Sequence, residues 1–253
     1  MPLVSIVIPT FNREKYVKEA ILSAMSQTVT DIEIIIVDNC STDNTESTVL
    51  HLASIDNRIK FFKNNTNIGP VRNWLNGVNF STSNYIKILF SDDLISPDCI
   101  EKLLPPMLNS DCALSFSTAI IGTNPWEGNI FYNCFDNDTL INSSFFIKST
   151  LHIFGSMPVS PGAAMFRKKD LLTNIFLHLD GIDDYDFSET GAGVDYLTYI
   201  VTALSYKNVS YSSTPTVFFR SHEGSLTIAD DGGQVSLGYK KAREWFFSKT
   251  NSF

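Results

Sequence analysis

Four short apolar runs alternate with three amphipathic segments in the first part of the chain, and this alternation restricts the possible folds most. The apolar runs predict buried strands over residues 3–8, 32–37, 59–62 and 84–90. The segments between them have helical spacing or helix-start signals, one from Arg13 to Gln27, one starting near Asp43, and one after Gly69-Pro70. Strands that alternate with helices in this way predict a parallel sheet with right-handed crossovers.

The second half, from about Pro97, is less regular. A helix is expected from Ser96 to Leu104, ending near Pro105-Pro106, and later helices from Asp195 to Leu204 and from Val235 to Phe247. Further strands are expected over residues 114–119, 163–166 and 217–219. Because no internal repeat or low-complexity linker interrupts the chain, we expect one domain over 1–253 with unequal halves, 1–105 and 106–253.

Composition excludes several classes of protein. A hydrophobic fraction of 43% indicates a globular chain, and a net charge of −8 argues against a nucleic-acid partner. Four cysteines without a CxxC pair favour free thiols in a reducing cytosol: Cys40, Cys99, Cys112 and Cys134. The N-terminus shows no signal peptide and no apolar run reaches about 18 residues, so we expect a cytoplasmic protein without a transmembrane segment.

A polar cluster follows each of the four strands of the first half. The clusters are Pro9 to Asn12, Asp38-Asn39, Asn65 to Gly69, and Ser91-Asp92-Asp93. In a parallel sheet all of them lie along one edge, where open α/β sheets form their ligand crevice. Independent surface turns would produce similar residues one at a time, but they need not share this chemistry.

Two adjacent carboxylates, Asp92 and Asp93, follow the fourth strand directly. Their mutual repulsion is costly at a buried strand end unless a positive charge offsets it. A Mg²⁺ or Mn²⁺ ion that also binds a ligand's phosphates would do so, because these ions prefer oxygen ligands. A surface turn containing two aspartates explains the tripeptide alone equally well.

The same segments resemble the N-terminal signature of family 2 inverting glycosyltransferases. The matching motifs are Val7–Arg13, Ala24–Thr28, Glu33–Thr45, Asn67–Asn73 and Ser91–Asp93. The match is dense over residues 3–105 and then thins to isolated signals around Pro161–Arg167, Val194–Tyr196 and Arg220–Thr227.

The resemblance implies the GT-A fold, an α/β domain with an N-terminal Rossmann-like nucleotide-binding half and a C-terminal acceptor-binding half. The two halves would share a mostly parallel mixed sheet. The implied reaction is a metal-dependent, inverting transfer of a sugar from a UDP- or dTDP-sugar. The acceptor would be a hydroxyl of a glycan or lipid-linked saccharide, in bacterial surface polysaccharide synthesis. The implied cofactor is Mn²⁺ or Mg²⁺.

For the nucleotide pocket, the resemblance implies contributions from Pro9, Thr10, Asn12, Asn67 and Gly69. Asp38 would accept a hydrogen bond from a base N–H, a role that suits a carboxylate. The alternative is that Asp38 is a simple strand-end residue. Arg72 resembles the nucleotide-side arginine of the family, and the alternative is a solvated surface side chain.

The resemblance implies a separate role for each acid of the motif Ser91–Asp93 and for His222. Asp92 would contact the ribose, Asp93 would bind the metal, and His222 would reach the metal or diphosphate. The resemblance also places Ser91 in the cofactor-binding site. Members of the family often have Asp at this position, and a hydroxyl there still ligates or hydrogen-bonds but brings no charge. A structural His is the alternative for His222.

The resemblance implies that Asp195 is the general base that deprotonates the acceptor hydroxyl. The family commonly has Glu where Val194 stands, and Asp195 could instead be a helix N-cap. Nearby competitors are Glu189 and a cluster that we interpret as a solvated loop: Asp180, Asp183, Asp184 and Asp186.

Two other functions compete with the transferase. A binding module that kept the donor pocket but lost catalysis would fit Ser91 and Val194, whereas retention of Asp93, Asp195 and His222 argues against it. A nucleotidyltransferase would need a glycine-rich basic loop after the first strand, and the sequence there is not one. A lipid-linked acceptor would bring the protein into peripheral contact with the inner membrane face, although no basic amphipathic helix supports firm attachment.

Overall fold

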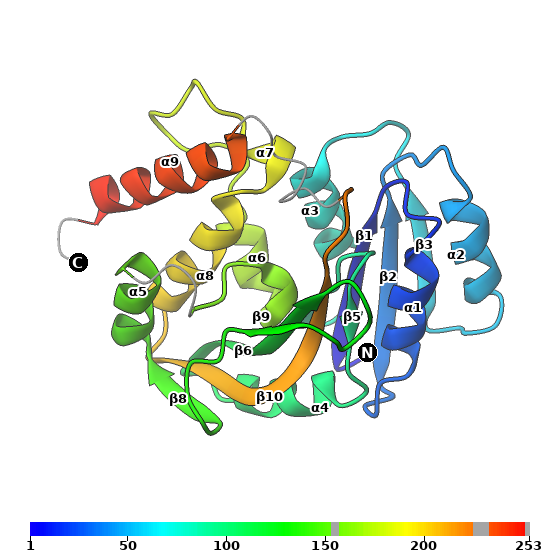
Figure 1. The fold of residues 1–253 in the computed structure, drawn as a ribbon, viewed down its shortest axis with the longest axis horizontal. Helices are drawn as coiled ribbons and strands as arrows, with labels where there is room; N and C mark the ends of the chain where they lie inside the picture. Colours follow the sequence, from blue (N-terminus) through cyan, green and yellow to red (C-terminus); the bar gives the residue numbers. More distant parts are fainter. Residues whose placement is uncertain (153–156, 225–232, 251–253) are drawn as a thin grey trace.

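The computed structural model describes residues 1–152, 157–224 and 233–250, and it confirms the alternation in the first half (Figure 1). The four strands are β1 (Val4–Thr10), β2 (Ile32–Asp38), β3 (Ile59–Lys63) and β4 (Tyr85–Ile88). Between them lie α1 (Val17–Met25), α2 (Thr45–Ala53) and α3 (Pro70–Phe80). The strands pair in parallel in the order β3-β2-β1-β4.

Helices cover both faces of this sheet, which explains why β1 and β2 are apolar along most of their length. All residues of β1 and β2 are buried, as is usual for parallel strands. On one face, α1 and α2 pack in a common core with α4 (Cys99–Met107). On the other face, α3 shares a core with α6 (Lys168–Asn174) and α8 (Val194–Leu204).

The second half continues the same sheet with mixed pairing. Beyond β4 the order is β9 (Ala164–Arg167), β6 (Cys112–Gly122), β10 (Asn208–Arg220) and β5 (Leu94–Ile95). β9 is antiparallel to both β4 and β6, whereas β6 and β10 are parallel. β7 (Asn129–Phe131) pairs with β6, and β8 (Thr139–Asn142) pairs with β10. The expected mixed sheet is confirmed, and the division into 1–105 and 106–253 within one domain stays a prediction.

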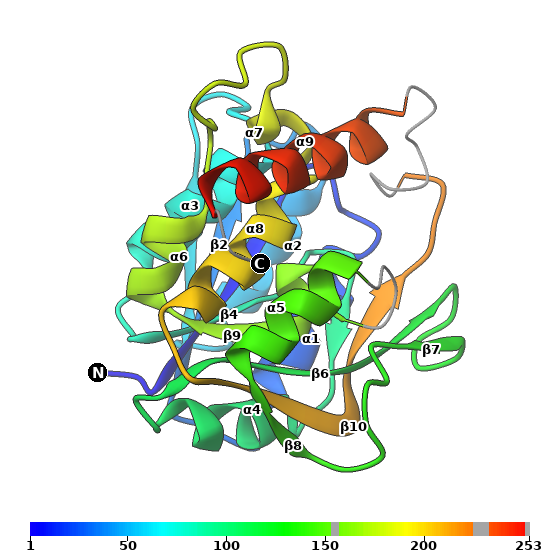
Figure 2. The same cartoon turned by 90° about the vertical axis from the view of Figure 1, so that its left-hand side faces the viewer.

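Four further helical segments complete the described second half. They are α5 (Ser143–His152), the 3₁₀ turn η1 (Pro161–Ala163), α7 (Phe187–Thr190) and α9 (Gln234–Lys249). Figure 2 shows α9 lying across α8, and the two helices are in contact. Phe246 of α9 is buried in the core beside α8. Within the described ranges, no helix has both the length and the apolar character needed to cross a bilayer.

Two predicted boundaries were wrong, and proline is involved in both. α4 does not end before Pro105-Pro106 but continues to Met107. Proline disfavours a helix because it lacks an N–H and restricts the preceding residue. Here the prolines lie in the final turn, and the buried side chains of Leu103 and Met107 hold that turn against the sheet.

The late strand was predicted over residues 217–219 only, whereas β10 begins at Asn208. Pro215 interrupts the apolar pattern, and the pairing with β6 shifts register between Ser212 and Val217. The strand therefore tolerates a proline because its ladder is irregular at that place. The short or polar elements β5, β7, β8, α5, α6 and α7 were not predicted.

Candidate active site

The carboxyl ends of the first-half strands meet at one edge of the sheet. The parallel register pairs Thr10 with Asp38, and Asp38 with Lys63. A cavity of about 1220 Å³ opens at this edge, and residues of both halves line it. Sequence-predicted site residues on its wall are Pro9, Thr10, Asn67, Ser91, Asp92, Asp93 and Asp195.

Asp93 is a buried carboxylate on the wall of this cavity, with 6% of its surface exposed. Burial raises its pKa well above the ordinary value, and the neighbouring charge of Asp92 raises that pKa further. The buried ammonium of Lys87 and the Arg220 side chain oppose this effect in part. Asp93 Oδ1 accepts a hydrogen bond from the Arg220 backbone N–H at 2.9 Å. Asp93 Oδ2 has no hydrogen-bond partner among the described residues.

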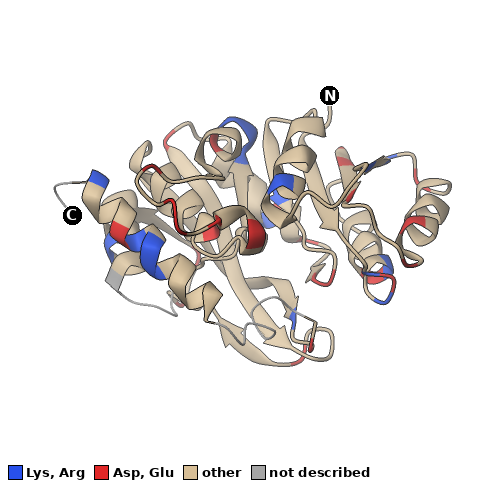
Figure 3. Cartoon of the chain, turned by 90° about the horizontal axis from the view of Figure 1, so that it is seen from above, with Lys and Arg blue, Asp and Glu red and all other residues tan. Residues whose placement is uncertain are grey.

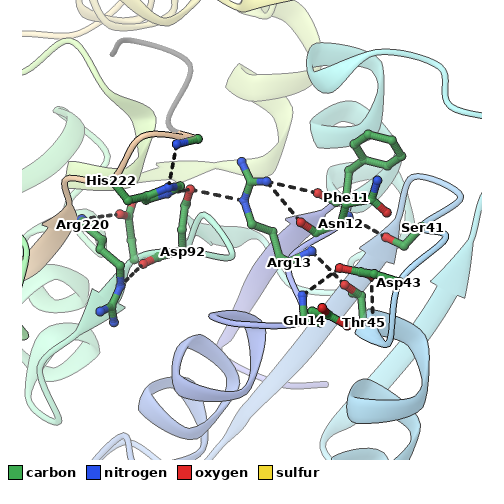
Figure 4. A network of polar contacts seen from close by, with 12 residues as sticks. Phe11, Asn12, Arg13, Glu14, Ser41, Asp43, Thr45, Asp92, Arg220 and His222 are labelled. Carbon is green, nitrogen blue, oxygen red and sulfur yellow. Dashed lines mark hydrogen bonds and ion pairs between the residues drawn. The ribbon is translucent and has the colours of Figure 1, made fainter. Parts of the chain in front are cut away.

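The side chains of Arg13 and His222 converge on Asp92, as Figure 4 shows. Asp92 Oδ2 lies 3.4 Å from Arg13 Nε and 3.0 Å from His222 Nε2. His222 Nδ1 accepts the Gly224 backbone N–H at 3.2 Å, so both of its ring nitrogens have partners. His222 lines a smaller cavity of about 590 Å³ beside Asn12 and Tyr16. Its proposed contact with a metal stays a prediction.

Thr10 and Asn39 form the part of the wall that continues β1 and β2. The Thr10 hydroxyl is buried and has no hydrogen-bond partner among the described residues. A buried polar atom without a partner is costly, so this hydroxyl is suited to a bound ligand. Asn39 crosslinks the neighbouring loop: its Nδ2 donates to Asn67 Oδ1 at 2.7 Å, and its Oδ1 accepts the Ile68 N–H at 3.0 Å.

Some sequence-predicted residues lie near the cavity without being part of its wall. Asp38 is fully buried, and its carboxylate accepts hydrogen bonds from the backbone N–H and the hydroxyl of Ser41. Asn12 has a left-handed φ of 49°, and its Oδ1 accepts the Thr42 N–H at 2.9 Å. Both side chains therefore brace the loops that surround the nucleotide-side wall.

Gly69 and Arg72 belong to the start of α3. Gly69 is the N-cap of this helix, and its carbonyl accepts the Asn73 N–H at 3.2 Å. Arg72 is exposed, and its guanidinium donates to the Ser188 hydroxyl of α7. The start of α3 is thus linked to the segment that carries the acidic residues of the second half.

Gly191 fixes this segment against α3. It has a left-handed φ of 76° and ends α7. A Cβ at this position would lie 2.4 Å from Trp74 Cη2, so the indole of α3 packs directly against the glycine backbone. A residue with a side chain could not occupy this position without moving Trp74 or the segment.

Asp195 is the second residue of α8 and lines the same cavity as the acid pair. It is not the N-cap, because Gly193 occupies that position. Asp195 Oδ1 accepts the N–H groups of Gly193 and Tyr196 at 2.9 and 2.7 Å, and Oδ2 accepts the Tyr239 hydroxyl at 2.5 Å. Burial raises the pKa of Asp195 to about 7, and the hydrogen bond from Tyr239 opposes this rise.

The competing acids divide into two groups. Glu189 lines the same cavity as Asp195. Asp184 pairs with Lys241 at 2.8 Å, and Asp186 caps α7 by accepting the Ser188 N–H. Asp180 and Asp183 are exposed, and none of these four aspartates is part of the cavity wall.

Sequence reasoning missed several residues of the wall. Arg13 and Asn39 belong to motifs that the sequence analysis recognised, so their place on the cavity wall could have been predicted from those motifs. Arg220 lies at the end of β10, and its guanidinium Nε donates to the Asp92 carbonyl at 3.0 Å. Nothing in the sequence around Tyr239 marks it as a neighbour of Asp195.

The wholly parallel half, the mixed second half and the acids at the strand ends define a protein of the GT-A fold class. The profile described as Glycosyl transferase family 2 matches residues 5–176, and the chain belongs to this family.

Curated relatives share about half of this chain. A Campylobacter jejuni protein named GalNAc(5)-diNAcBac-PP-undecaprenol β-1,3-glucosyltransferase is 35% identical over 131 residues, which are 51% of this chain and 41% of that protein. The putative teichuronic acid biosynthesis glycosyltransferase TuaG of Bacillus subtilis is 34% identical over 118 residues, 46% of each chain. The chain spans about half the length of the curated relatives it matches.

Among solved structures, S. aureus TarS 1–349 in complex with UDP-GlcNAc superposes with a TM-score of 0.75. The superposition covers 97% of this chain and 66% of that chain, at 18% sequence identity. At this identity the likeness establishes the fold alone.

Proposed function

We propose that this chain is a metal-dependent inverting glycosyltransferase that uses a UDP- or dTDP-sugar as donor. The acceptor is a hydroxyl of a glycan or lipid-linked saccharide, in the synthesis of a bacterial surface polysaccharide. One observation carries the proposal: a single cavity is lined by the strand-end residues Thr10 and Asn39, the acid pair Asp92 and Asp93, and Asp195.

The donor nucleotide occupies the strand-end part of this cavity. The partnerless hydroxyl of Thr10 supports a ligand there, and Pro9 and Asn67 line the same region. The family resemblance adds Asp38 as base acceptor, Arg72 and Gly69 on the nucleotide side, and Asp92 at the ribose. The complex of TarS with UDP-GlcNAc supports a nucleotide-sugar donor for a chain of the same fold.

The chemistry of Asp93 fits a divalent cation, Mn²⁺ or Mg²⁺. Its Oδ2 lacks a partner among the described residues, and burial next to Asp92 makes its negative charge costly without a cation. Within the described residues, no three His, Cys, Asp or Glu side chains gather as a metal centre. Asp93, and His222 in our proposal, would therefore be its few protein ligands, and the bound ion would offset charge on the diphosphate leaving group.

Asp195 is the general base. Its carboxylate takes the proton of the acceptor hydroxyl as that oxygen bonds to the anomeric carbon. The bond from this carbon to the diphosphate breaks on the opposite face, so the configuration inverts and the nucleoside diphosphate leaves with the bonding electrons. A pKa near 7 suits a base that works at neutral pH.

The acceptor class is supported by two relatives whose names refer to an undecaprenol-linked saccharide and to teichuronic acid. An acceptor of the first kind places the reaction at the inner face of the cytoplasmic membrane. The protein would act there from the cytoplasm.

The test combines binding with turnover. A panel of UDP-, dTDP- and GDP-sugars is screened by thermal shift with and without Mn²⁺, and release of the nucleoside diphosphate is then measured. A donor at 100 times its Kd stabilises the protein by about 2.7 kcal/mol, which corresponds to a Tm increase of about 5–10 °C. Binding without hydrolysis or transfer would instead identify a binding module with this fold.

A further inference from the structure

The start of α8 and the helix α9 approach each other closely. A Cβ on Gly193 would lie 2.7 Å from the Gly238 carbonyl oxygen and 2.8 Å from the Ala242 Cβ. A Cβ on Gly238 would lie 2.6 Å from the Ala192 carbonyl oxygen. These small residues bring α9 against the segment that carries Asp195, as the crossing of α8 and α9 in Figure 2 illustrates.

Among the described residues, three polar contacts join α9 to residues 184–195. Tyr185 Oη donates to the Gln234 carbonyl at 2.9 Å, and Lys241 Nζ pairs with Asp184 at 2.8 Å. Of the three, the contact from Tyr239 Oη to Asp195 Oδ2 reaches the carboxylate on the cavity wall. The other two contacts serve as internal comparisons, because they join the same elements away from that carboxylate.

Burial and hydrogen bonds are the main influences on the pKa of Asp195. Burial raises its pKa, and the Tyr239 hydroxyl is the largest influence that lowers it, ahead of the Tyr196 and Gly193 N–H groups. Among the described residues, the other titratable side chains that face Asp195 or Tyr239 are Tyr132, Tyr185, Tyr196 and Tyr199. Those that share the cavity wall with them are Arg13, Asp92, Asp93, Glu189, Arg220, Lys240, Arg243 and Glu244. Tyr132 and Tyr199 are neutral phenols at physiological pH, because burial raises the pKa of each.

We propose that Tyr239 is a positioning residue of the transfer reaction. Its phenol fixes the orientation of the Asp195 carboxylate and keeps that carboxylate ionised, so that the remaining lone pairs of Oδ2 face the acceptor hydroxyl. This inference rests on the proposed role of Asp195 as base. It makes α9, which lies beyond the family-matched residues 5–176, a part of the active site.

The test is the pH profile of transfer by Tyr239→Phe, which removes the hydroxyl and keeps the ring. Loss of a hydrogen bond to a carboxylate moves the acidic limb of kcat to higher pH by about one unit. The rate then falls about fivefold at pH 7 and recovers by about pH 9, with the donor KM unchanged. A merely structural role would lower the rate by the same factor at every pH.

Tyr185→Phe is the matched control, because it deletes a phenol hydroxyl from the same helix contact without touching Asp195. Its acidic limb should coincide with that of the parent protein. Gly238→Ala provides a second variant that keeps the Tyr239 hydroxyl. The added Cβ would lie 2.4 Å from Tyr185 Oη and 2.6 Å from the Ala192 carbonyl oxygen, so it pushes α9 away from both. The acidic limb of kcat should therefore move in the same direction as in Tyr239→Phe.

The outcomes separate this inference from the proposed function. If Asp195→Asn transfers normally, the role of base is lost and this inference falls with it. If Asp195→Asn is inactive, and neither Tyr239→Phe nor Gly238→Ala moves the limb, the positioning role is overturned while the proposed function stands.

Discussion

The cavity has two walls that arise in different ways. The donor wall, formed by Thr10, Asn39, Asn67, Asp92 and Asp93, comes from loops that follow successive strands of a parallel sheet. The base wall, formed by Asp195 and Tyr239, comes from two helices joined by packing across 44 residues of sequence. Topology alone brings the donor wall together, whereas the base wall depends on the close fit of α9 on α8.

The largest effect should come from the base wall. Asp195→Asn is expected to lower kcat by about 10²–10⁴, because the acceptor hydroxyl loses its proton acceptor. The thermal shift caused by the donor should not change, since that ligand contacts the other wall. Asp184→Asn, which alters an exposed acid paired with Lys241, is the control. If Asp195→Asn transfers at a near-normal rate and Glu189→Gln loses transfer activity, Glu189 is the general base instead of Asp195.

The donor wall should respond differently to the loss of an acid. Asp93→Asn is expected to lower transfer by about 10²–10³ and to remove the effect of Mn²⁺ on donor binding. The ligand-free protein should be as stable as the parent or more so, because a costly buried charge is removed. The measurement is donor thermal shift with and without Mn²⁺, with Asp111→Asn as a surface control. If Mn²⁺ affects donor binding by Asp93→Asn as it does in the parent protein, Asp93 is not a ligand of the cation.

The pKa of Asp195 predicts a pH dependence that belongs to the base wall. With a pKa of about 7, transfer should rise about tenfold per pH unit below pH 7 and level off above it. The folded-state pKa of Asp195 is raised from an unfolded value of about 4. Between about pH 4 and pH 7, Asp195 therefore keeps its proton in the folded protein and loses it in the unfolded chain. Its contribution to stability is therefore present below about pH 4 and lost as pH rises through 7. A Tm profile of Asp195→Asn should lack this component, and identical profiles would contradict the raised pKa.

The smallest effect should come from the partnerless hydroxyl of the donor wall. Thr10→Val removes a buried unpaired hydroxyl, so the ligand-free protein should gain about 1 kcal/mol, or about 2–4 °C in Tm. Donor affinity should fall, because the hydroxyl no longer meets the ligand. Ser115→Ala removes another buried hydroxyl that has no hydrogen-bond partner in the described part of the chain. Ser115 lies outside the cavity, so this variant should leave donor affinity unchanged. Equal donor affinity in the two variants would show that the Thr10 hydroxyl does not contact the ligand.

The contrast between the walls also explains how much the sequence could predict. The strand and helix order of residues 1–105 follows from local periodicity, and the convergence of Thr10, Asn67 and Asp93 follows from the parallel pairing. The direction of each side chain does not follow. Asn12 is turned by a left-handed backbone, and the carboxylate of Asp38 is engaged by Ser41.

Prediction was weakest in the second half, where long-range contacts override local pattern. β10 contains Pro215 and a register shift, so its sequence does not alternate as a regular strand does. Tyr239 belongs to a helix that its sequence predicts, but the sequence does not indicate which residue Tyr239 faces. Its relation to Asp195 depends on the close approach of Gly193 and Gly238, which no local pattern marks.

The packing of Trp74 against Gly191 restricts how the two halves could be recombined. A chimaera that joins this nucleotide-side half to the second half of a relative would need a glycine at the position of Gly191. A side chain there would displace the indole, and because Trp74 and Gly191 both line the cavity, it would change the shape of the cavity between the two walls. New acceptor specificities are therefore easier to engineer by changing residues around this contact than by exchanging whole halves across it.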